Sequence, residues 1–422
     1  MEKQYGMDQR MNDQWTLPNG LRIVGERLPY LRSVSIGVWL RVGSMMETPE
    51  ENGLSHFLEH MVFKGTTHRT TRQIAEEMDA VGGQLNAFTG KDCTCLYAKV
   101  IDEDIALAVD VLSDLAINAT MDADEFDKER GVILEEISMD EDSPEDLVHE
   151  LLSQAMFGSQ SLAMPILGTT ELISNYKRED LLTYRAKHYR PEDTVEALAG
   201  NYDPEQVREL IEQYFGAWQN PGKRLATPQE ALLSGQVRVK EKDTEQLHLC
   251  LGFPGVGYGA EGLYAQAVLN NVLGGSMSSR LFQRVREELG MAYSIYTYPN
   301  SYLGCGTFAV YAGVSPKNGQ QVLEEIRREL KKLTDEGITE KEFREAKTQL
   351  RGGYLLGLES PGGRMQSLGR SLLLLDRTFT PEETVQKIER VTMEDVMASA
   401  RAALNVEPCL SAAGKGAAAF GK

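Results

Sequence analysis

The sequence predicts an α+β protein made of two related halves, each a mostly antiparallel sheet covered by helices. Short runs that alternate apolar and polar residues, as strands do, are interspersed with longer segments of helical periodicity. The same order of elements occurs before residue 216 and again after residue 236. The two halves are not visibly similar in sequence, so the predicted repeat rests on this order of elements.

The first half begins with strands. A Pro18-Asn19-Gly20 turn precedes a strand at 21–26, and residues 33–42 alternate between apolar and polar side chains. Capping residues, glycines and prolines then mark where helices begin and end. We expect helices at about 52–63 and 71–80, a hairpin at 84–100, helices at 102–118, 122–141, 144–156 and 170–187, a strand at 194–199 and a helix after Asp203-Pro204.

A segment with prolines and small polar residues interrupts this pattern between residues 216 and 236. We interpret it as a linker, which gives a first domain at 1–216, the linker at 217–236 and a second domain at 237–422. The second domain repeats the order of elements. We expect strands at 237–240 and 246–253, helices at 262–273 and 278–289, a hairpin at 292–315 and helices at 318–335 and 340–357.

Composition restricts the class of partner. The chain has 422 residues, of which 41% are hydrophobic and 25% charged, as in ordinary globular proteins. Its 63 acidic and 44 basic side chains give a formal charge of −19. Nucleic acids and anionic membranes attract clustered Lys and Arg, so neither is expected as a partner. The acidic balance favours a basic or extended polypeptide ligand instead.

The cellular compartment is predicted from the first residues and the cysteines. The first ten residues contain no apolar run and no arginine-rich stretch, so neither a signal peptide nor a presequence is expected. No apolar run approaches the length of a membrane span. Five cysteines are an odd and sparse set, which indicates reduced thiols in a cytoplasmic protein. We expect Cys93 and Cys95 to pack in a strand rather than form a redox or metal pair.

The expected helix at 52–63 carries the strongest chemical signal. His56 and His60 are four residues apart and so share one helix face, where two imidazoles can bind one metal ion. Glu59 borders this face and can polarise a metal-bound water. The His-x-x-Glu-His order is the inverzincin motif. Two structural histidines on a half-buried helix are the alternative, but the triplet favours one zinc ion per chain.

A catalytic zinc ion usually has three protein ligands and one open position, so a third ligand is expected elsewhere. The helix at 122–141 offers Glu129, Glu135 and Glu136. Glu129 and Glu136 are seven residues apart and lie on nearly the same face, whereas Glu135 projects away from it. Either of that pair can bind zinc while the other supports a histidine or the water. An ordinary acidic surface helix is the alternative.

Four segments together resemble the pitrilysin, insulysin and mitochondrial processing peptidase family of zinc peptidases, most of all its short bacterial members. They are HFLEHMVFKGT, GGQLNAFTGKD, ERGVILEEISMDED and GGSMSSRLFQRVREELGMAYS. The resemblance extends over nearly the whole chain. It implies that Glu136 is the third zinc ligand, that Glu129 supports the site and that Glu59 is the general base.

The resemblance also implies substrate contacts. Arg286 and Tyr293 match a pair that binds substrate and stabilises the oxyanion, for which both are suitable donors. A surface arginine and a strand aromatic are the alternative. Further matches are an edge strand that binds an extended peptide and a glycine-rich loop that contacts substrate, which here are Asn86, Ala87 and Phe88, and Gly274 and Gly275. The loop is neither a GxGxxG sequence nor a P-loop, so nucleotide binding is not expected.

These expectations combine into a zinc-dependent metallo-endopeptidase that hydrolyses peptides or unfolded polypeptide segments, with Glu59 activating a zinc-bound water. The alternative is a non-catalytic or partner-dependent scaffold or assembly subunit with the same fold. His248 is the one histidine of the second half, which is therefore expected to be metal-free. In the family, two-domain chains form one side of a clamshell. Because this chain contains both sets of site residues, a homodimer is expected.

Overall fold

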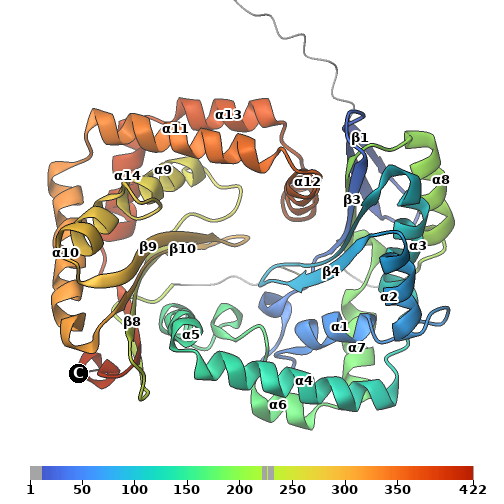
Figure 1. Cartoon of the computed structure of the whole chain (residues 1–422), viewed down its shortest axis with the longest axis horizontal. Helices are drawn as coiled ribbons and strands as arrows, with labels where there is room; N and C mark the ends of the chain where they lie inside the picture. Colours follow the sequence, from blue (N-terminus) through green and yellow to red (C-terminus); the bar gives the residue numbers. More distant parts are fainter. Residues whose placement is uncertain (1–11, 221–225, 227–231, 422) are drawn as a thin grey trace, which may run out of the picture. The chain divides into compact units, whose positions relative to one another are not determined.

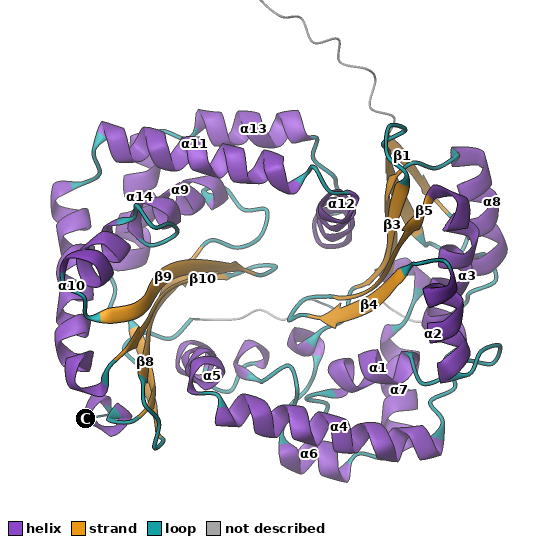
Figure 2. Cartoon of the chain, viewed as in Figure 1, coloured by secondary structure: helices purple, strands orange, loops and turns teal. Residues whose placement is uncertain are grey.

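A computed structural model describes residues 12–220, 226 and 232–421, which divide into two compact units (Figure 1). Unit 1 takes its residues from Met1–Leu134, Ile166–Ala226 and Leu356–Phe379. Unit 2 takes them from Glu135–Pro165, Thr227–Leu355 and Thr380–Lys422. Each unit combines one sheet with helices, which confirms the predicted α+β class (Figure 2).

Unit 1 is built on a six-stranded sheet with the order β1-β2-β6-β3-β5-β4, in which only β2 and β6 are parallel neighbours. The central strands β3 and β6 are buried almost throughout, whereas the edge strand β4 is at most half-buried. The strands are β1 (Asn12–Thr16), β2 (Arg22–Arg27), β3 (Ser33–Leu40), β4 (Gln84–Thr89), β5 (Thr94–Ile101) and β6 (Thr194–Gly200).

Helices cover both faces of this sheet, with α12 against one face and α3 and α8 on the other side (Figure 1). The single helix expected at 170–187 is two helices, because the Tyr176 hydroxyl donates to the carbonyls of Glu50 and Asn52 and fixes a break there. The helices of unit 1 are α1 (Leu54–Val62), α2 (Thr71–Ala80), α3 (Ile105–Asn118), the start of α4 (Ala123–Asp142), α6 (Thr170–Asn175), α7 (Arg178–His188), α8 (Pro204–Phe215) and α12 (Pro361–Leu375).

Unit 2 is built on a five-stranded sheet with the order β7-β11-β8-β10-β9, in which only β7 and β11 are parallel neighbours. This order and these orientations repeat those of β2-β6-β3-β5-β4, which confirms that the two units are related. The strands are β7 (Val237–Glu241), β8 (Leu247–Gly255), β9 (Ala292–Ser301), β10 (Gly306–Val314) and β11 (Cys409–Gly414).

The core of unit 2 includes apolar side chains from β8, β10, α9, α10 and α14. Within the helix expected at 278–289, residues Phe282–Glu288 form a π-helix. The helices of unit 2 are the end of α4, α5 (Pro144–Phe157), α9 (Leu263–Leu273), α10 (Gly319–Glu336), α11 (Glu340–Gly357), α13 (Pro381–Arg390) and α14 (Met393–Leu404). No element was expected after residue 357, where the structure has the α-helices α12, α13 and α14 and the strand β11.

Each unit takes one helix from the opposite half of the sequence. Helix α5 packs on β8 and β11, where the Ser411 hydroxyl donates to the carbonyl of Val148 (2.7 Å). Helix α12 packs on β2, β3 and β6, where Arg364 pairs with the buried Glu26. The predicted domains, with limits at 216 and 236, are each one continuous stretch of sequence. Each compact unit instead combines three separate stretches. The difference arises because each helix buries its apolar face on a sheet that is distant in sequence.

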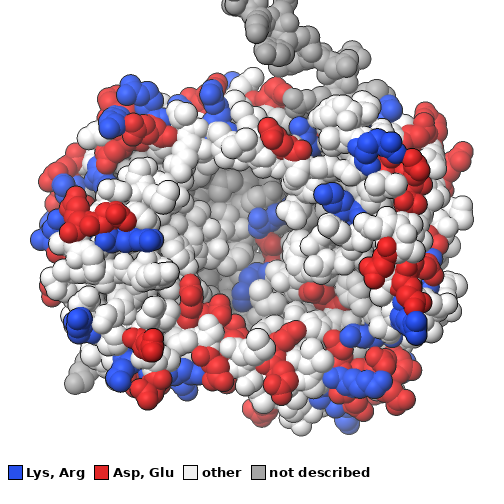
Figure 3. Space-filling model, in the orientation of Figure 1, with Lys and Arg blue, Asp and Glu red and all other residues white. Residues whose placement is uncertain are grey.

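The surface carries both signs of charge. Acidic and basic side chains are interspersed on the face shown in Figure 3. Among the helices of the described residues, none combines the length and the apolar character that crossing a membrane requires.

Candidate metal centre

The N-terminus of helix α1 is fixed by a buried glutamate. The carboxylate of Glu47 accepts hydrogen bonds from Asn52 Nδ2 (3.0 Å) and from the main-chain N–H groups of Gly53 (2.9 Å) and Ser55 (2.8 Å). It satisfies donors that have no partner within the helix and complements the helix dipole. Burial raises the pKa of Glu47, although these donors oppose the rise. Glu47 was not predicted, because it lies upstream of α1 and outside any common capping spacing.

Two further contacts hold α1 in place. The ring of Phe57 stacks on that of Phe126 in α4, with centroids 4.6 Å apart and planes 8° from parallel. On another side, the hydroxyls of Ser55 and Tyr184 in α7 are 2.7 Å apart. At the start of the helix, Gly53 has φ +97° and lies against the main chain of Gly168. A Cβ added at Gly53 would lie only 2.8 Å from Gly168 Cα. These contacts fix the direction in which the histidines of α1 point.

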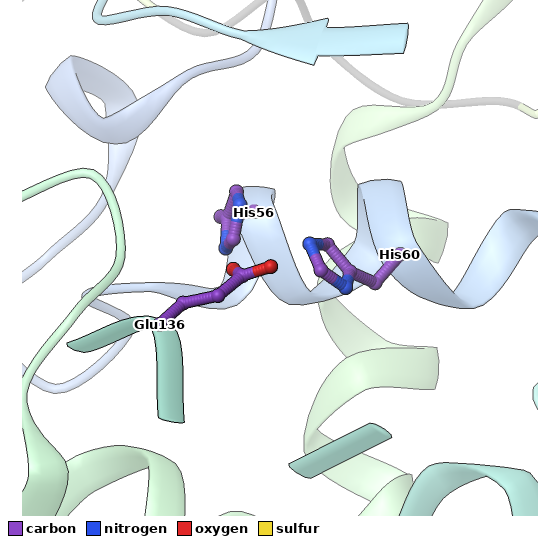
Figure 4. A group of neighbouring side chains, drawn as sticks. All are labelled: His56, His60 and Glu136. Atoms are coloured by element: carbon purple, nitrogen blue, oxygen red, sulfur yellow. The ribbon is translucent and has the colours of Figure 1, made fainter. Parts of the chain in front are cut away.

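His56 and His60 lie side by side on α1, with ring centroids 4.5 Å apart. Burial and then the neighbouring His60 lower the pKa of His56 to about 3, so its imidazole is neutral and offers a lone pair. Figure 4 shows the carboxylate of Glu136 beside the two imidazoles. The ligand atoms of these three half-buried residues all lie within 4.8 Å of one another. Among the described residues, no other group of three His, Cys, Asp or Glu side chains is arranged in this way.

The donor set fits zinc. Two imidazoles and one carboxylate form a common three-ligand set of catalytic zinc, in which two ligand atoms are about 3.4 Å apart. The ligand atoms of His56, His60 and Glu136 lie within 4.8 Å of one another, which is close enough for the three residues to share one ion. Helix α4 is continuous from Ala123 to Asp142, so the contacts that fix its first turns also set the direction of Glu136.

Glu129 supports His60 from α4. It is 5% exposed, and its Oε1 atom accepts a hydrogen bond from His60 Nδ1 (2.9 Å). Its Oε2 atom pairs with Lys64 Nζ (2.7 Å). With Nδ1 engaged, Nε2 is the nitrogen of His60 that remains for a metal. The residue pattern left open which of Glu129 and Glu136 faces the metal, and the structure places Glu136 with the histidines and Glu129 against His60.

The remaining residues of this region lie on α1 and β4. Glu59 is half-buried on α1 and directly precedes His60. Helix α1 packs against β4, the strand that contains Asn86-Ala87-Phe88. β4 pairs only with β5 among the described strands, so its other edge has main-chain groups outside the sheet ladder. The ring of Phe88 packs edge-on against Trp39, with centroids 5.6 Å apart.

In unit 2, the structure brings Arg286 and Tyr293 together. The guanidinium carbon of Arg286 lies 5.9 Å from the centroid of the Tyr293 ring, and the Tyr293 residue is 75% exposed. The two glycines pack closely after α9: a Cβ on Gly274 would lie 2.6 Å from Thr297 N, and one on Gly275 would lie 2.7 Å from Asn270 Nδ2. Close packing thus explains why glycine occupies both positions. Their contact with substrate stays a prediction.

Comparison with known proteins identifies the family. A model described as insulinase (peptidase family M16) matches residues 22–170, and one described as peptidase M16 inactive domain matches residues 175–350. The chain therefore belongs to peptidase family M16, as its motifs predicted.

Relatives support this membership. An uncharacterized zinc protease of Bacillus subtilis is 45% identical over 391 residues, which are 93% of this chain and 95% of the relative. One of Streptomyces coelicolor is 42% identical over 94% of this chain and 88% of the relative. The crystal structure of a protease from Helicobacter pylori has a TM-score of 0.89 at 20% identity and covers 96% of this chain and 99% of that one. That of a peptidase M16 inactive domain from Pseudomonas fluorescens has a TM-score of 0.90 at 19% identity, with 96% and 98% covered. The two structures show a shared fold.

Proposed function

We propose that this protein is a zinc-dependent metallo-endopeptidase that hydrolyses peptides or unfolded polypeptide segments. The observation that carries the proposal is the convergence of His56, His60 and Glu136, with ligand atoms within 4.8 Å of one another. Membership in a peptidase family and relatives named zinc proteases support it. One zinc ion per chain is expected, because the described residues contain one such group.

The residues around this group have distinct roles in the proposed reaction. A bound zinc ion would supply a Lewis acid that polarises the scissile carbonyl and acidifies water. Glu59, which directly precedes His60, accepts the proton of the attacking water and later donates it to the leaving amine. Glu129 holds His60 through Nδ1 and so presents Nε2. Glu47 fixes the start of α1, so both histidines project from an anchored helix.

The proposed substrate is an extended peptide that adds to β4. Main-chain groups on the free edge of Asn86-Ala87-Phe88 can pair with a peptide strand, which gives affinity with little demand on sequence. Arg286 and Tyr293 are proposed donors to the substrate oxygen that becomes negative, and Gly274 and Gly275 are proposed contacts of the peptide. A homodimer and a cytoplasmic location complete the proposal and rest on the sequence.

The alternative function is a non-catalytic or partner-dependent subunit with the same fold. One observation favours it: the model that matches residues 175–350 is described as an inactive domain. That match covers the half without the metal group, however, and His56, Glu59, His60 and Glu136 are all present in the other match. Activity of the purified chain alone distinguishes the two functions.

The experiment is incubation of the purified, zinc-loaded chain with a diverse peptide library, followed by mass spectrometry of the fragments. The proposal predicts internal cleavage that a chelator abolishes and added zinc restores. Cleavage that is absent with zinc bound would support the scaffold function. Cleavage that appears only after a second protein is added would support the partner-dependent one.

A further inference from the structure

The segment that carries Arg286 has an unusual main-chain conformation. Residues Phe282–Glu288 form a π-helix, in which Leu289 N donates to Arg284 O (3.2 Å). Buried side chains of Leu281 and Val285 anchor it, and Gly290 with φ +60° follows it. π-helical turns are rare and are frequently found at functional sites. The side chains of this segment are therefore candidates for a functional role.

The π-helix presents Arg286 to two aromatic rings. The guanidinium carbon lies 4.7 Å from the centroid of Phe282 and 5.9 Å from that of Tyr293. Both distances are within the range in which a cation is attracted to a ring face. Phe282 is half-buried, so its ring is held by the protein, whereas Tyr293 is exposed. The fixed member of this group is Phe282.

Arg286 differs from the neighbouring Arg280 and Arg284 in how closely it pairs with carboxylates. Arg280 donates two hydrogen bonds to the carboxylate of Glu342 (2.6 and 2.9 Å), and Arg284 forms an ion pair with Glu288 at 2.8 Å. The carboxylate that pairs with Arg286 is that of Glu287, at 3.8 Å, which is too long for a hydrogen bond. Ring contacts engage the face of a guanidinium, whereas carboxylates engage its N–H groups. Arg286 is thus oriented while its N–H groups remain available.

We propose that Phe282 is a positioning residue, whose ring holds the guanidinium of Arg286 beside Tyr293 so that both side chains can donate to the same substrate oxygen. This inference rests on the proposed peptidase function, in which Arg286 and Tyr293 contact substrate. It adds a residue and a physical means of orientation. A charged partner would orient Arg286 equally well but would compete with the substrate for its N–H groups, whereas a ring does not.

The contact between Arg286 and the Phe282 ring is tested without an activity assay, by NMR of the full chain labelled with 15N-arginine. The Nε–H resonance of Arg286 is assigned by its loss in Arg286→Lys. We expect an upfield shift from the ring current, which Phe282→Leu removes and Phe282→Tyr retains. An Arg286 resonance that Phe282→Leu leaves in place would overturn the inference. Circular dichroism and the unfolding midpoint identify a misfolded variant, and Phe282→Met then replaces Phe282→Leu.

The functional part is tested by a double-mutant cycle on peptide hydrolysis. Phe282→Leu is expected to lower kcat/KM about two- to fivefold, the size of one exposed cation–π contact, and Phe282→Tyr to restore it. In an Arg286→Ala background, Phe282→Leu should have no further effect, because its action is through Arg286. Equal losses in both backgrounds would overturn the inference. Failure of the proposed function is a different result, namely no hydrolysis by the zinc-loaded wild-type protein.

Discussion

Glu129 Oε1 lies 2.9 Å from His60 Nδ1, and Glu129 is 5% exposed. A buried carboxylate on the far nitrogen of a metal-binding imidazole fixes the orientation of the ring and raises its basicity. Lys64 Nζ, 2.7 Å from Oε2, balances the charge of Glu129. In the proposed zinc site, this relationship would make the zinc affinity depend on Glu129, a residue that is not itself a proposed ligand.

Replacing Glu129 should therefore weaken metal binding. We expect Glu129→Gln to raise the zinc dissociation constant about 10- to 100-fold, because the amide holds His60 Nδ1 less strongly. Competition with a zinc chelator measures this change. Glu141→Gln is the control, since Glu141 is an exposed acid of the same helix. An unchanged zinc affinity in Glu129→Gln would show that the contact does not support His60 as a ligand.

Separate replacement of the adjacent Glu135 and Glu136 tests which of them is the third zinc ligand. Glu136 is half-buried beside the histidines, whereas Glu135 is exposed. We expect Glu136→Gln to lose zinc and peptide hydrolysis together and Glu135→Gln to retain both. Metal analysis after gel filtration gives the zinc content of each variant. Full zinc occupancy in Glu136→Gln would remove this residue from the proposed ligand set.

Removal of the cap of α1 should reduce stability. Glu47→Ala leaves the N–H groups of Gly53 and Ser55 without their carboxylate, which should cost about 1–3 kcal/mol in the free energy of unfolding. Glu47→Gln keeps one oxygen acceptor and should cost less. Chemical unfolding of both variants measures these losses. If Glu47→Ala is as stable as the wild type, the cap does not anchor α1.

A fully buried carboxyl makes stability depend on pH. Glu196 lies in β6 between Ile23 and Val38, neither of its oxygens has a hydrogen-bond partner in the described part of the chain, and burial raises its pKa to about 8. Its neutral form is preferred in the folded state, so its contribution is present below the ordinary pKa near 4.5 and is lost as the pH rises to about 8.

Relative to Glu196→Met, the wild type should lose up to ~1.4 kcal/mol of unfolding free energy per pH unit between these pKa values. Unfolding of both proteins from pH 5 to pH 8 measures the difference. A difference that is constant across this range would contradict the assignment of the pH dependence to Glu196.

The position of α12 on the sheet of unit 1 depends on a small residue. A Cβ on Gly369 would overlap the indole of the buried Trp39, so Gly369→Ala should destabilise the protein by about 1–3 kcal/mol. Gly362 lies in the same helix, and the nearest atom to a Cβ there is Ser35 Oγ at 3.9 Å. Gly362→Ala is thus a matched control that should be neutral or stabilising. Equal unfolding midpoints for the two variants would contradict the packing of α12 on Trp39.

Sequence periodicity predicted most elements because it reports which face of a segment is buried. The helix expected at 71–80 is α2, and the helix expected at 122–141 is α4 within one residue at each end. Periodicity does not report which sheet a helix covers, so the exchange of α5 and α12 between the halves could not be predicted. Nor does it report a cap from outside the helix such as Glu47, which accepts from the N–H groups of Gly53 and Ser55 across a loop.

The site was predicted in part for a similar reason. The spacing of His56 and His60 is local to one helix, so the sequence alone indicates a shared metal. The choice between Glu129 and Glu136 depends on how α4 packs on α1, through contacts such as Phe57 on Phe126. The ring of Phe282 beside Arg286 depends on a π-helix that the sequence pattern does not distinguish from an α-helix.

The most direct test of the central claim compares the wild type with Glu59→Gln in zinc content and peptide hydrolysis. Glu59 is proposed as the general base and not as a ligand, so the variant should bind one zinc ion per chain as the wild type does. Its hydrolysis should fall at least about 100-fold, since it cannot accept the proton of the attacking water. A zinc-loaded Glu59→Gln protein that cleaves peptides as fast as the wild type would contradict the proposed mechanism.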